Sequence, residues 1–544
     1  MRTDEQLLQS ALGDPDFKLG THDKPQRRGL FNVYVLTLPD RFNRGLPPVW
    51  HFAILASGIK SGDKSLPEQI GSEVSAIIDQ HPKDDCLLFF LSDYPEIRID
   101  HQLPKAHPRV FALDHHELPG GRPRKALEPR LTPLTFGVRR RLDRQSSRLL
   151  LCPYVRNKPA QEWRFFGRRK ELNDLVFSSE NFMVVGARRI GKTSLLRQTQ
   201  SQLEREGNHA FFVDAEAYAN ERELAKAIMQ EVSFRDYQAL ERRNQLTDER
   251  FLELALKRIS GERKVVVLID ELGNVMSKQK GDSWRIIGTL RRFAQSGRIR
   301  IIGSAFQEFF LKQQQDFSGP WVNFASTLRL SGFRDAEIDE FVLQPLQVWA
   351  ETANPAHIRE TVLAAVGRHP MLLQYFCAAV HAAVARQDTV NLMTAVKDVI
   401  GNQMTEIFAE PVEEIFYRMP SSILRYIFLA SCIEAEVKQK PLHSMELDDD
   451  WLEKTLRSAG YSSNTTVRRN LLEGLEVRGL TQSVGGDHGV QIIIAPIIFR
   501  FIKRTFTSRS DAQGLNKLAT KYKLEIDGEK DDWGLARLAP QSVT

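Results

Sequence analysis

Cysteine is scarce in this chain: its four residues are scattered, and no two form a Cys-x-x-Cys pair. That spacing excludes a disulfide framework and a thiolate zinc site, so we expect free thiols. The chain also lacks any apolar run close to the roughly 20 residues that a membrane-spanning helix needs. Its first residues carry acids and no apolar core, unlike a secretory signal. These absences predict a cytoplasmic protein without a membrane partner.

The length of 544 residues exceeds one ordinary domain, and at about 150 residues each, roughly three or four domains are expected. Apolar residues make up 42% and charged residues 26% of the chain, which is typical of globular domains and excludes a disordered or fibrous chain. Internal repeats and low-complexity tracts are lacking as well. We therefore expect several folded domains of different kinds.

Positive charge is concentrated in one segment. The formal net charge is +6, but the stretch from Arg122 to Lys158 holds eleven basic and two acidic residues, which leaves about −3 for the rest. Such a stretch is typical of a site for a polyanion such as DNA. Its aromatic residues are only Phe136 and Tyr154, so base stacking would contribute little. A solvated linker, or one packed on an acidic face, would have the same composition.

Short apolar runs in the first part of the chain predict a small α/β domain. Four runs have the length and composition of buried strands, at residues 33–38, 52–57, 86–92 and 109–113. Residues 66–81 have the period of a helix with one apolar face. Strands interleaved with a helix indicate an α/β arrangement. The first 30 or so residues are polar, and we expect a loose lead-in.

Acidic residues and histidines lie at the expected strand ends of this domain: Asp93, Asp100, His101, Asp114, His115, His116 and Glu117. Carboxylates and imidazoles suit metal ions, so a metal-dependent nuclease or hydrolase is one interpretation. Polar strand ends exposed to water are the other. The domain would accordingly be an effector or a sensor.

A loop at 186–193 carries the strongest functional motif. The apolar strand 181–185 runs into a loop of the form GxxxxGKT, and a helical pattern follows directly. Glycines let such a loop curl until its N–H groups surround phosphate oxygens, and the helix offers its positive N-terminal end. Lys192 would reach the β- and γ-phosphates, and the Thr193 hydroxyl would bind Mg²⁺. The predicted nucleotide-binding residues of the loop are Gly186, Ala187, Arg188, Arg189, Ile190, Gly191, Lys192, Thr193 and Ser194.

A second apolar strand, 264–269, ends in two acids, Asp270 and Glu271. Ligands bind at this carboxyl edge of parallel sheets. We expect Asp270 to hold Mg²⁺ through water and Glu271 to activate the attacking water. For this pair taken alone, acids facing solvent would be the alternative. With the loop, the pair predicts binding of ATP or GTP and favours hydrolysis, with Lys192 and Glu271 as catalytic residues.

A third strand ends at Ser304, which would lie between these two motifs and sense the γ-phosphate. A small residue in a tight turn is the alternative. Arg291, Arg292 or Arg298 could offer an arginine finger to the nucleotide of a neighbouring subunit. Arginines on a solvated helix face would look the same in the sequence.

Taken in order, these residues resemble the STAND class of signalling P-loop ATPases, in particular its prokaryotic MNS-type branch. The resemblance begins with FGRRKEL at 166–172, similar to a segment that lies close to the nucleotide base. It continues through the loop and the acids to LRLSGF at 328–333. GRHPMLLQ at 367–374 is similar to the GxP motif of the helical lid, with Arg368 in place of a second glycine. The match covers about residues 161–505.

The resemblance implies the fold class: an α/β P-loop NTPase core of the ASCE or AAA+-like kind with a helical lid, a winged helix and a small N-terminal α/β domain. In the lid, Pro370 would begin a helix next to the adenine. His369 would contact a phosphate or be a packing residue. The expected boundaries are 1–121 for the N-terminal domain, 122–160 for the basic linker, 161–330 for the core, 331–410 for the lid, 411–510 for the winged helix and 511–544 for a polar, peripheral tail.

Residues 411–510 show three helical patterns followed by a hairpin, as in a winged helix. The third helix, 464–479, would present Arg468 and Arg469 to a DNA major groove. Two glutamates on the same helix oppose this charge. In proteins of the STAND class, this module usually packs on the ATPase.

We therefore expect an ATP-controlled switch or sensor with slow, regulatory hydrolysis, closed with ADP and open with ATP, in prokaryotic defence or regulation. Its partners would be a homo-oligomer or an unknown protein. The rival is an AAA+ DNA-binding ATPase of the origin-recognition or transposition-regulator kind, which would hold DNA with the 122–158 segment and the winged helix. A third interpretation makes the N-terminal domain an effector enzyme gated by the ATPase.

Overall fold

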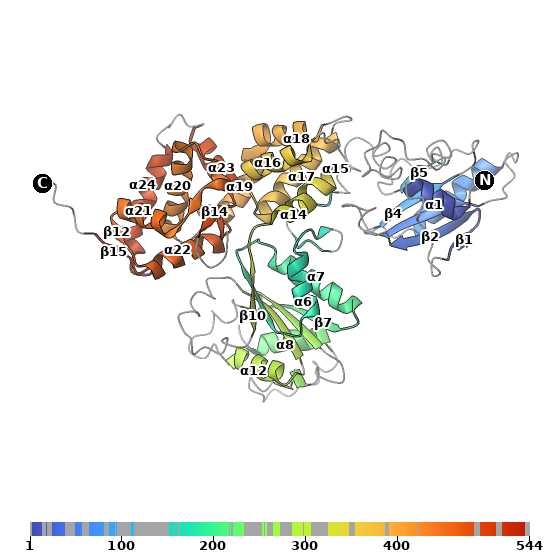
Figure 1. Cartoon of the computed structure of the whole chain (residues 1–544). Coiled ribbons are helices and arrows are strands. Elements are labelled where there is room, and N and C mark those ends of the chain that lie inside the picture. Colours follow the sequence, from blue (N-terminus) through green and yellow to red (C-terminus); the bar gives the residue numbers. More distant parts are fainter. Residues whose placement is uncertain are drawn as a thin grey trace. The chain divides into compact units, whose positions relative to one another are not determined.

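The structure is a computed structural model of the whole chain (Figure 1). It describes residues 3–12, 18, 24–37, 49–56, 65–80, 86–92, 94, 99, 110–113, 152–156, 158–161, 164–216, 218, 221–232, 253–254, 256–257, 265–272, 285–297, 299–305, 325–347, 354–386, 391–419, 421–483, 490–507 and 514–538. The chain forms two compact units. Unit 1 comprises Met1–Tyr154, Asp339–Ile358 and Cys377–Val399, and unit 2 comprises Val155–Ile338, Arg359–Phe376 and Ile400–Thr544.

Unit 1 contains a five-stranded sheet in the order β1-β2-β3-β4-β5. Its strands are β1 (Gln26–Arg28), β2 (Phe31–Thr37), β3 (Val49–Leu55), β4 (Cys86–Leu91) and β5 (Val110–Leu113). The first three strands run antiparallel and the last three parallel. Parallel neighbours need a crossover, which α3 (Leu66–Gln80) supplies between β3 and β4. Strands β2 to β5 and the helix coincide with the predicted apolar runs, whereas β1, with the polar sequence Gln-Arg-Arg, was not predicted.

Both faces of this sheet are buried, which explains why its strands read as continuous apolar runs. On one face, α3 packs Ile70, Val74 and Ile78 against alternate strand residues. On the other face, aromatic rings gather around Phe89. Its ring centroid lies 5.1 Å from that of Trp50 and 5.2 Å from that of Phe111.

The loose lead-in expected before this domain is wrong for its described residues. Helix α1 (Asp4–Leu12) begins with a capping box, in which the N–H of Gln6 donates to the Thr3 hydroxyl and the N–H of Thr3 donates to the Gln6 side chain. Its Leu7, Leu8, Ala11 and Leu12 are buried. The pattern Thr-x-x-Gln before an apolar helical period was the overlooked signal.

Unit 2 is built on a second sheet, in which all five strands are parallel and follow the order β10-β6-β9-β8-β7. The strands are β6 (Phe182–Gly186), β7 (His209–Asp214), β8 (Val265–Asp270), β9 (Ile299–Ala305) and β10 (Ser326–Leu330). Because they are parallel, their carboxyl ends meet at one edge. The three sequence motifs at the ends of β6, β8 and β9 therefore lie together.

Helices cover both faces of this sheet (Figure 1). The core on one face includes side chains of α6 (Arg169–Phe177) and α7 (Lys192–Arg205). The core on the other face includes those of α8 (Glu221–Val232) and α12 (Arg285–Gln295). Strand β8 sends alternate side chains into the two cores, so each of its residues is buried. This double burial explains its uninterrupted apolar sequence.

The chain from 335 to 417 is helical wherever the structure describes it, apart from short turns. Its elements are α14 (Asp335–Ile338), the π-helix η4 (Asp339–Leu343), α15 (Gln344–Gln347), α16 (Pro355–Ala365), α17 (Pro370–Arg386), α18 (Leu392–Asp398), the π-helix η5 (Val399–Gln403), α19 (Met404–Val412) and the π-helix η6 (Glu413–Tyr417). None of the helices in the described ranges is long and apolar enough to cross a bilayer.

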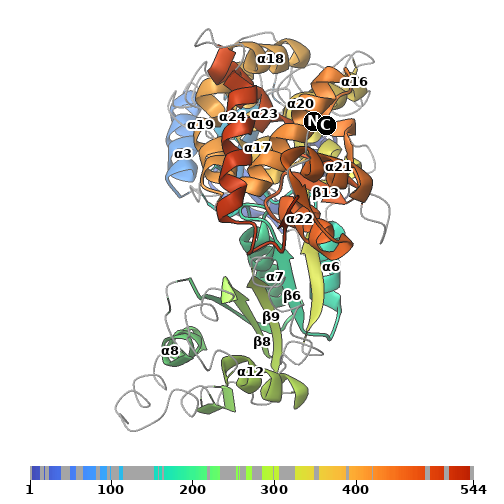
Figure 2. The same cartoon turned by 90° about the vertical axis from the view of Figure 1, so that its left-hand side faces the viewer.

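The C-terminal part of unit 2 combines helices with a small sheet (Figure 2). These are α20 (Ser422–Val437), α21 (Asp449–Ala459), α22 (Thr465–Val477), a three-stranded sheet in the order β11 (Glu446–Leu447), β14 (Gln491–Ile493) and β13 (Thr481–Ser483), and α23 (Pro496–Thr507). The side chain of Asn464 caps α22 by accepting from the N–H of Val467 at 2.8 Å.

The tail after 511 was expected to be peripheral, but residues 514–538 are part of this fold. Helix α24 (Gly514–Glu525) packs along α20 and buries Tyr522, and β15 (Ala536–Arg537) pairs with β12 (Tyr461–Ser462). Glu529 lies at the start of α20, where its carboxylate accepts from the N–H of Ser422 at 2.7 Å. The tail thus satisfies backbone groups that a helix start leaves without partners.

Replacing this carboxylate tests the role of the tail. Glu529→Gln should lower the free energy of unfolding of unit 2 by about 1 kcal/mol, because the helix start keeps a weaker, uncharged acceptor. Urea unfolding of the full chain measures the change. Asp532→Asn removes a charge at an exposed position nearby and should change stability by less than about 0.5 kcal/mol. Equal effects of the two variants would leave Glu529 with no specific role.

Candidate active site

The loop predicted to bind phosphate joins β6 to α7 at the carboxyl edge of the second sheet. Its backbone is left-handed at Arg189 (φ 60°) and Gly191 (φ 103°), which curls the chain before α7 begins at Lys192. Glycine adopts such angles freely, whereas arginine does so under strain. A Cβ at Gly186 would lie 2.8 Å from the Leu330 carbonyl oxygen of β10, so a larger residue would push the two strands apart.

Lys192 is only 4% exposed. Its Nζ donates to the carbonyl oxygens of Gly186 and Ala187, both at 3.2 Å. Burial lowers the pKa of this ammonium, and the nearby carboxylates of Glu271 and Asp270 oppose that shift. The loop thus holds one buried positive charge beside the two acids at the end of β8.

Asp270, the last residue of β8, is 2% exposed and fixed by hydrogen bonds. Its Oδ1 accepts from the hydroxyl of Ser304, on the adjacent strand β9, and at 3.1 Å from the N–H of Glu271. The same N–H also donates to the Ser304 Oγ at 3.0 Å. Ser304 therefore orients the acids directly, a contact that differs from the γ-phosphate sensing expected of it.

Glu271 combines backbone strain with an unsatisfied side chain. Its φ is 51°, and its buried Oε2 has no hydrogen-bond partner among the described residues. Burial, followed by the charge of Asp270, raises the pKa of its carboxyl group to about 7 against the opposing ammonium of Lys192. A carboxylate with a raised pKa accepts a proton more readily, as a general base must.

Two further acids, which were not predicted from the sequence, lie nearby. Asp214 ends β7 and stands in register with Asp270 on β8. Together with Glu216, it contributes to the raised pKa of Glu271. The sequence contained a signal for Asp214, because the apolar run 210–213 also ends in an acid.

The donor set at this edge fits a magnesium ion. Mg²⁺ usually takes one or two carboxylates, several waters and the phosphate oxygens of a substrate. Asp270 supplies the carboxylate, and Thr193 supplies a half-buried hydroxyl from the loop. The described residues contain no cluster of three or more His, Cys, Asp or Glu side chains that could hold a metal by itself. Ser194 has another contact, since its Oγ accepts from the N–H of Ala160 at 3.0 Å.

His369 lies deep in unit 2 beside the phosphate loop. It is fully buried, and neither ring nitrogen has a hydrogen-bond partner among the described residues. Burial and the nearby charge of Arg168 lower its pKa to about 3, so the ring is neutral. A Cβ at Gly479, just after α22, would lie 2.5 Å from the His369 Cδ2 and 3.5 Å from the Ala187 Cβ. Phosphate loop, lid and C-terminal part thus meet at this histidine, and α17 begins at the next residue, Pro370, as predicted.

The arginine that departs from the GxP pattern leaves its turn intact. Gly367 has φ 95°, and a Cβ there would lie 2.0 Å from the carbonyl oxygen of Ile494. The N–H of Arg368 donates to that same oxygen at 2.7 Å. Its guanidinium pairs with Asp335 at 2.6 Å. The turn requires glycine only at the first of the two positions.

Glu337, in α14, ties the segment before α6 to the start of the lid. Its side chain is 8% exposed and accepts from the N–H of Arg168 at 2.7 Å and the N–H of Arg334 at 2.8 Å. These bonds and the two guanidinium groups outweigh its burial and lower the pKa of its carboxyl group. Glu171 completes the network by pairing with Arg334 at 3.0 Å.

Two of the finger and DNA candidates, Arg292 and Arg468, form ion pairs within the chain. Arg292 pairs with Glu253 at 2.8 Å, while Arg298 lies outside the described residues. Arg468, expected to face DNA, is 7% exposed, and its Nε donates to Asp449 at 2.8 Å. Of the predicted pair on α22, only Arg469 is exposed.

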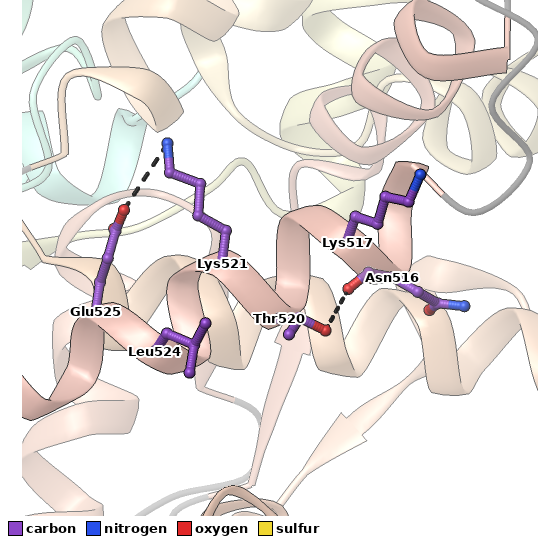
Figure 3. A pocket seen from close by; sticks show the side chains of 6 residues that line it. All are labelled: Asn516, Lys517, Thr520, Lys521, Leu524 and Glu525. Atoms are coloured by element: carbon purple, nitrogen blue, oxygen red, sulfur yellow. Dashed lines mark hydrogen bonds and ion pairs between the residues drawn. The ribbon is translucent and has the colours of Figure 1, made fainter.

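Several candidates fall outside the described residues. These are Asp93, Asp100, His101, Asp114, His115, His116 and Glu117 of the N-terminal domain, together with most of the basic segment, residues 122–151. A pocket of about 640 Å³ lies elsewhere, along α24 (Figure 3). Its lining is Asn516, Lys517, Thr520, Lys521, Leu524 and Glu525, all from one helix. This shallow surface has no buried charge, and it is not a candidate for the chemistry.

Comparison with known proteins identifies the core. Residues 177–308 match the family described as "AAA domain". This segment includes the phosphate loop, the acids at the end of β8 and Ser304. With the parallel sheet around the loop, it is a P-loop ATPase domain of the AAA kind. No curated protein matches the chain.

Among the solved structures that align with the chain are proteins of Pyrococcus abyssi and Aeropyrum pernix. The Walker-type ATPase paby2304 of Pyrococcus abyssi is 16% identical with a TM-score of 0.43, and the alignment covers 64% of this chain and 99% of that one. The ORC2 protein of Aeropyrum pernix, in ADPNP–ADP complexes, is 15% identical with a TM-score of 0.43, covering 69% and 98%. The ORC1 protein of Aeropyrum pernix, in complex with DNA, is 14% identical with a TM-score of 0.31, covering 63% and 94%. Likenesses this weak assign no function.

The network around Glu337 can be tested by removing its charge. Glu337→Gln should lower the free energy of unfolding of unit 2 by about 2 kcal/mol, because the amide cannot accept all of these bonds and adds a donor among donors. Urea unfolding measures the loss, with Glu360→Gln on the exposed side of α16 as the control. If both variants unfold at the wild-type urea concentration, the network does not stabilise the junction.

Proposed function

We propose that this chain is an ATP-binding and ATP-hydrolysing switch of the STAND-like kind, in which nucleotide at the phosphate loop sets the position of the lid and the C-terminal part. The observation that carries the proposal is the meeting of Ala187, His369 and Gly479. Each comes from a different part of unit 2. Because Ala187 and the His369 ring both lie close to Gly479, a change in the loop would act on the lid and the C-terminal part over a short distance.

The loop residues 186–194 bind the phosphates, with backbone N–H groups and the start of α7 supplying the positive potential. Lys192 exchanges its two carbonyl partners for phosphate oxygens. Asp270 and Thr193 hold Mg²⁺, which when bound neutralises phosphate charge and orients the transferred group. Glu271 accepts the proton of the attacking water. Ser304 holds Asp270 and the backbone of Glu271 in place during the reaction.

His369 is the lid residue that contacts the bound nucleotide. A neutral, buried imidazole that has no partner in the described part of the chain can give one hydrogen bond and accept another. A phosphate or base next to it would satisfy a group that otherwise costs stability. Behind it, the Gly367 and Ile494 contact transmits a shift of α17 to β14 and α23. This pathway supports a two-state response to nucleotide.

We further propose that residues 421–507 form a winged helix, supported by the order α20, α21, α22 and the β13–β14 pair. ATP rather than GTP as substrate, slow regulatory turnover, homo-oligomerisation and a role in prokaryotic defence or regulation follow from the STAND resemblance. Unit 1 would then carry the effector or sensor domain.

The rival function, a DNA-binding AAA+ ATPase, is favoured by one observation, the basic stretch from Arg122 to Lys158. The contacts of two α22 side chains do not favour DNA binding by the winged helix. Arg468 is held by Asp449, and Glu473 faces the charge of Arg329 in β10. DNA would therefore bind through the basic segment.

Two substitutions test the hydrolytic site. Lys192→Ala should reduce ATP affinity at least tenfold, because it removes the buried charge that meets the phosphates. Glu271→Gln should retain ATP but reduce turnover by about 10² to 10⁴. Phosphate release and nucleotide titration, with ATP and GTP side by side, measure both. Turnover near wild type in both variants would refute the site assignment.

The switch itself is tested with the Glu271→Gln variant, which should stay in the ATP state. Its sedimentation coefficient or protease pattern should differ between saturating ATP and ADP, because contacts to the γ-phosphate select one arrangement of the lid. Identical profiles in the two nucleotides would exclude a nucleotide-driven change of shape or assembly.

The rival function makes a different prediction. Replacing Arg139, Arg140, Arg141 and Arg144 by Gln should weaken duplex DNA binding. It should also flatten the dependence of log affinity on log salt by about 0.9 for each phosphate that is no longer neutralised. ATP hydrolysis without DNA should hardly change, because the segment precedes the core. Equal salt slopes for the two proteins would show that the basic segment does not touch DNA.

A further inference from the structure

Two arginines of the phosphate loop share one carboxylate from outside the ATPase core. The Nε atoms of Arg188 and Arg189 lie 3.0 and 3.1 Å from the same oxygen, Oε1 of Glu414. All three residues belong to unit 2. The side chain of Glu414 is 12% exposed, whereas those of Arg188 and Arg189 are 63% and 39% exposed. The acid is thus the buried, fixed member of the group.

The segment that carries Glu414 is shaped to present it. Glu414 lies in the π-helix η6, which begins directly after α19 ends at Val412, and Pro411 lies inside the last turn of α19. One turn earlier, Glu410 accepts from the Tyr375 hydroxyl of α17 at 3.2 Å. The guanidinium of Arg156 lies 5.5 Å from the centre of the Tyr375 ring. Two acids spaced by four residues therefore point to one side of the helix and are held there by contacts.

The arginines are also in a strained part of the loop. Arg189 has a φ of 60°, and the loop on either side of it carries the backbone groups proposed to bind phosphate. A guanidinium group binds carboxylate and phosphate with the same geometry and the same donors. Glu414 and the nucleotide phosphates are therefore alternative partners for the same two side chains.

We propose that Glu414 is a latch that competes with the phosphates of ATP for Arg188 and Arg189. The inference rests on the proposed function of the loop as a nucleotide site and adds to it a regulatory residue in the segment leading to α20. Engagement of the arginines by phosphate releases Glu414, and engagement by Glu414 weakens nucleotide binding. By linkage, a partner that releases Glu414 from the arginines raises the affinity for ATP by a certain factor. ATP then shifts the equilibrium between bound and released Glu414 by the same factor.

The closing experiment is a titration of the full chain with ATP and with ADP in the presence of Mg²⁺. Glu414→Gln should tighten ATP binding about three- to fivefold, because it removes the competitor, and should affect ADP less. Glu413→Gln, which removes the same charge from the exposed neighbouring position, should stay within about twofold of wild type. Glu414→Asp, which keeps the charge on a shorter side chain and protects the fold, should fall between wild type and Glu414→Gln.

A double-mutant cycle separates competition from general electrostatics. In a chain with Arg188→Gln and Arg189→Gln, the additional change Glu414→Gln should have no effect on ATP affinity. Equal affinities of Glu414→Gln and Glu413→Gln, weaker binding in Glu414→Gln, or a full effect in the arginine-free background would each overturn the latch. Lys192→Ala serves as the reference: if wild type and Lys192→Ala bind ATP equally, the nucleotide site itself is misassigned, whatever Glu414 does.

Discussion

A single buried ammonium group, that of Lys192, determines much of what surrounds it. A charge removed from water must be compensated nearby, and here two carbonyl oxygens of the loop and the carboxylates of Asp270 and Glu271 do so. Those carboxylates in turn repel each other. Ser304 donates a hydrogen bond to Asp270, whereas burial and the charge of Asp270 raise the pKa of Glu271. The sheet order makes this possible, because it brings the ends of three strands that are distant in the sequence to one edge.

Close backbone approach connects this centre to the rest of unit 2. Gly367 and Gly479 each occupy a position where a side chain would collide with a neighbouring segment, Ile494 in one case and His369 in the other. There is no space for a side chain at either glycine. At Gly367 the neighbouring atom is a backbone oxygen, so a displacement of the start of α17 is passed on to the backbone at Ile494. At Gly479 the neighbour is the His369 ring, which is fully buried.

The sequence predicted the features that are encoded locally. A strand, a glycine-rich loop and a helix follow one another within 25 residues, so the position of Lys192 and Thr193 could be read directly. Partners could not be read, because they come from distant elements. Arg468 looks free for DNA until α21 places Asp449 against it. The polar tail was predicted to be peripheral because a few buried residues among many polar ones leave a weak apolar pattern. In the structure, Tyr522 is buried and Glu529 binds the start of α20.

The left-handed backbone at this site has an evolutionary consequence. Among the described non-glycine residues, positive φ occurs at Arg168, Arg189, Glu271 and Gln439, and Arg189 and Glu271 lie at the carboxyl edge of the second sheet, in the proposed nucleotide site. Each costs on the order of 1 kcal/mol that glycine would avoid. A descendant that no longer needs nucleotide would gain backbone stability by replacing Glu271 with glycine, whereas at Arg189 the loss of the ion pair with Glu414 would offset part of the gain. Homologues that keep these side chains despite that gain are therefore expected to be ATPases still under selection. The glycines of the loop are a less sensitive sign, because the backbone requires them whether or not nucleotide binds.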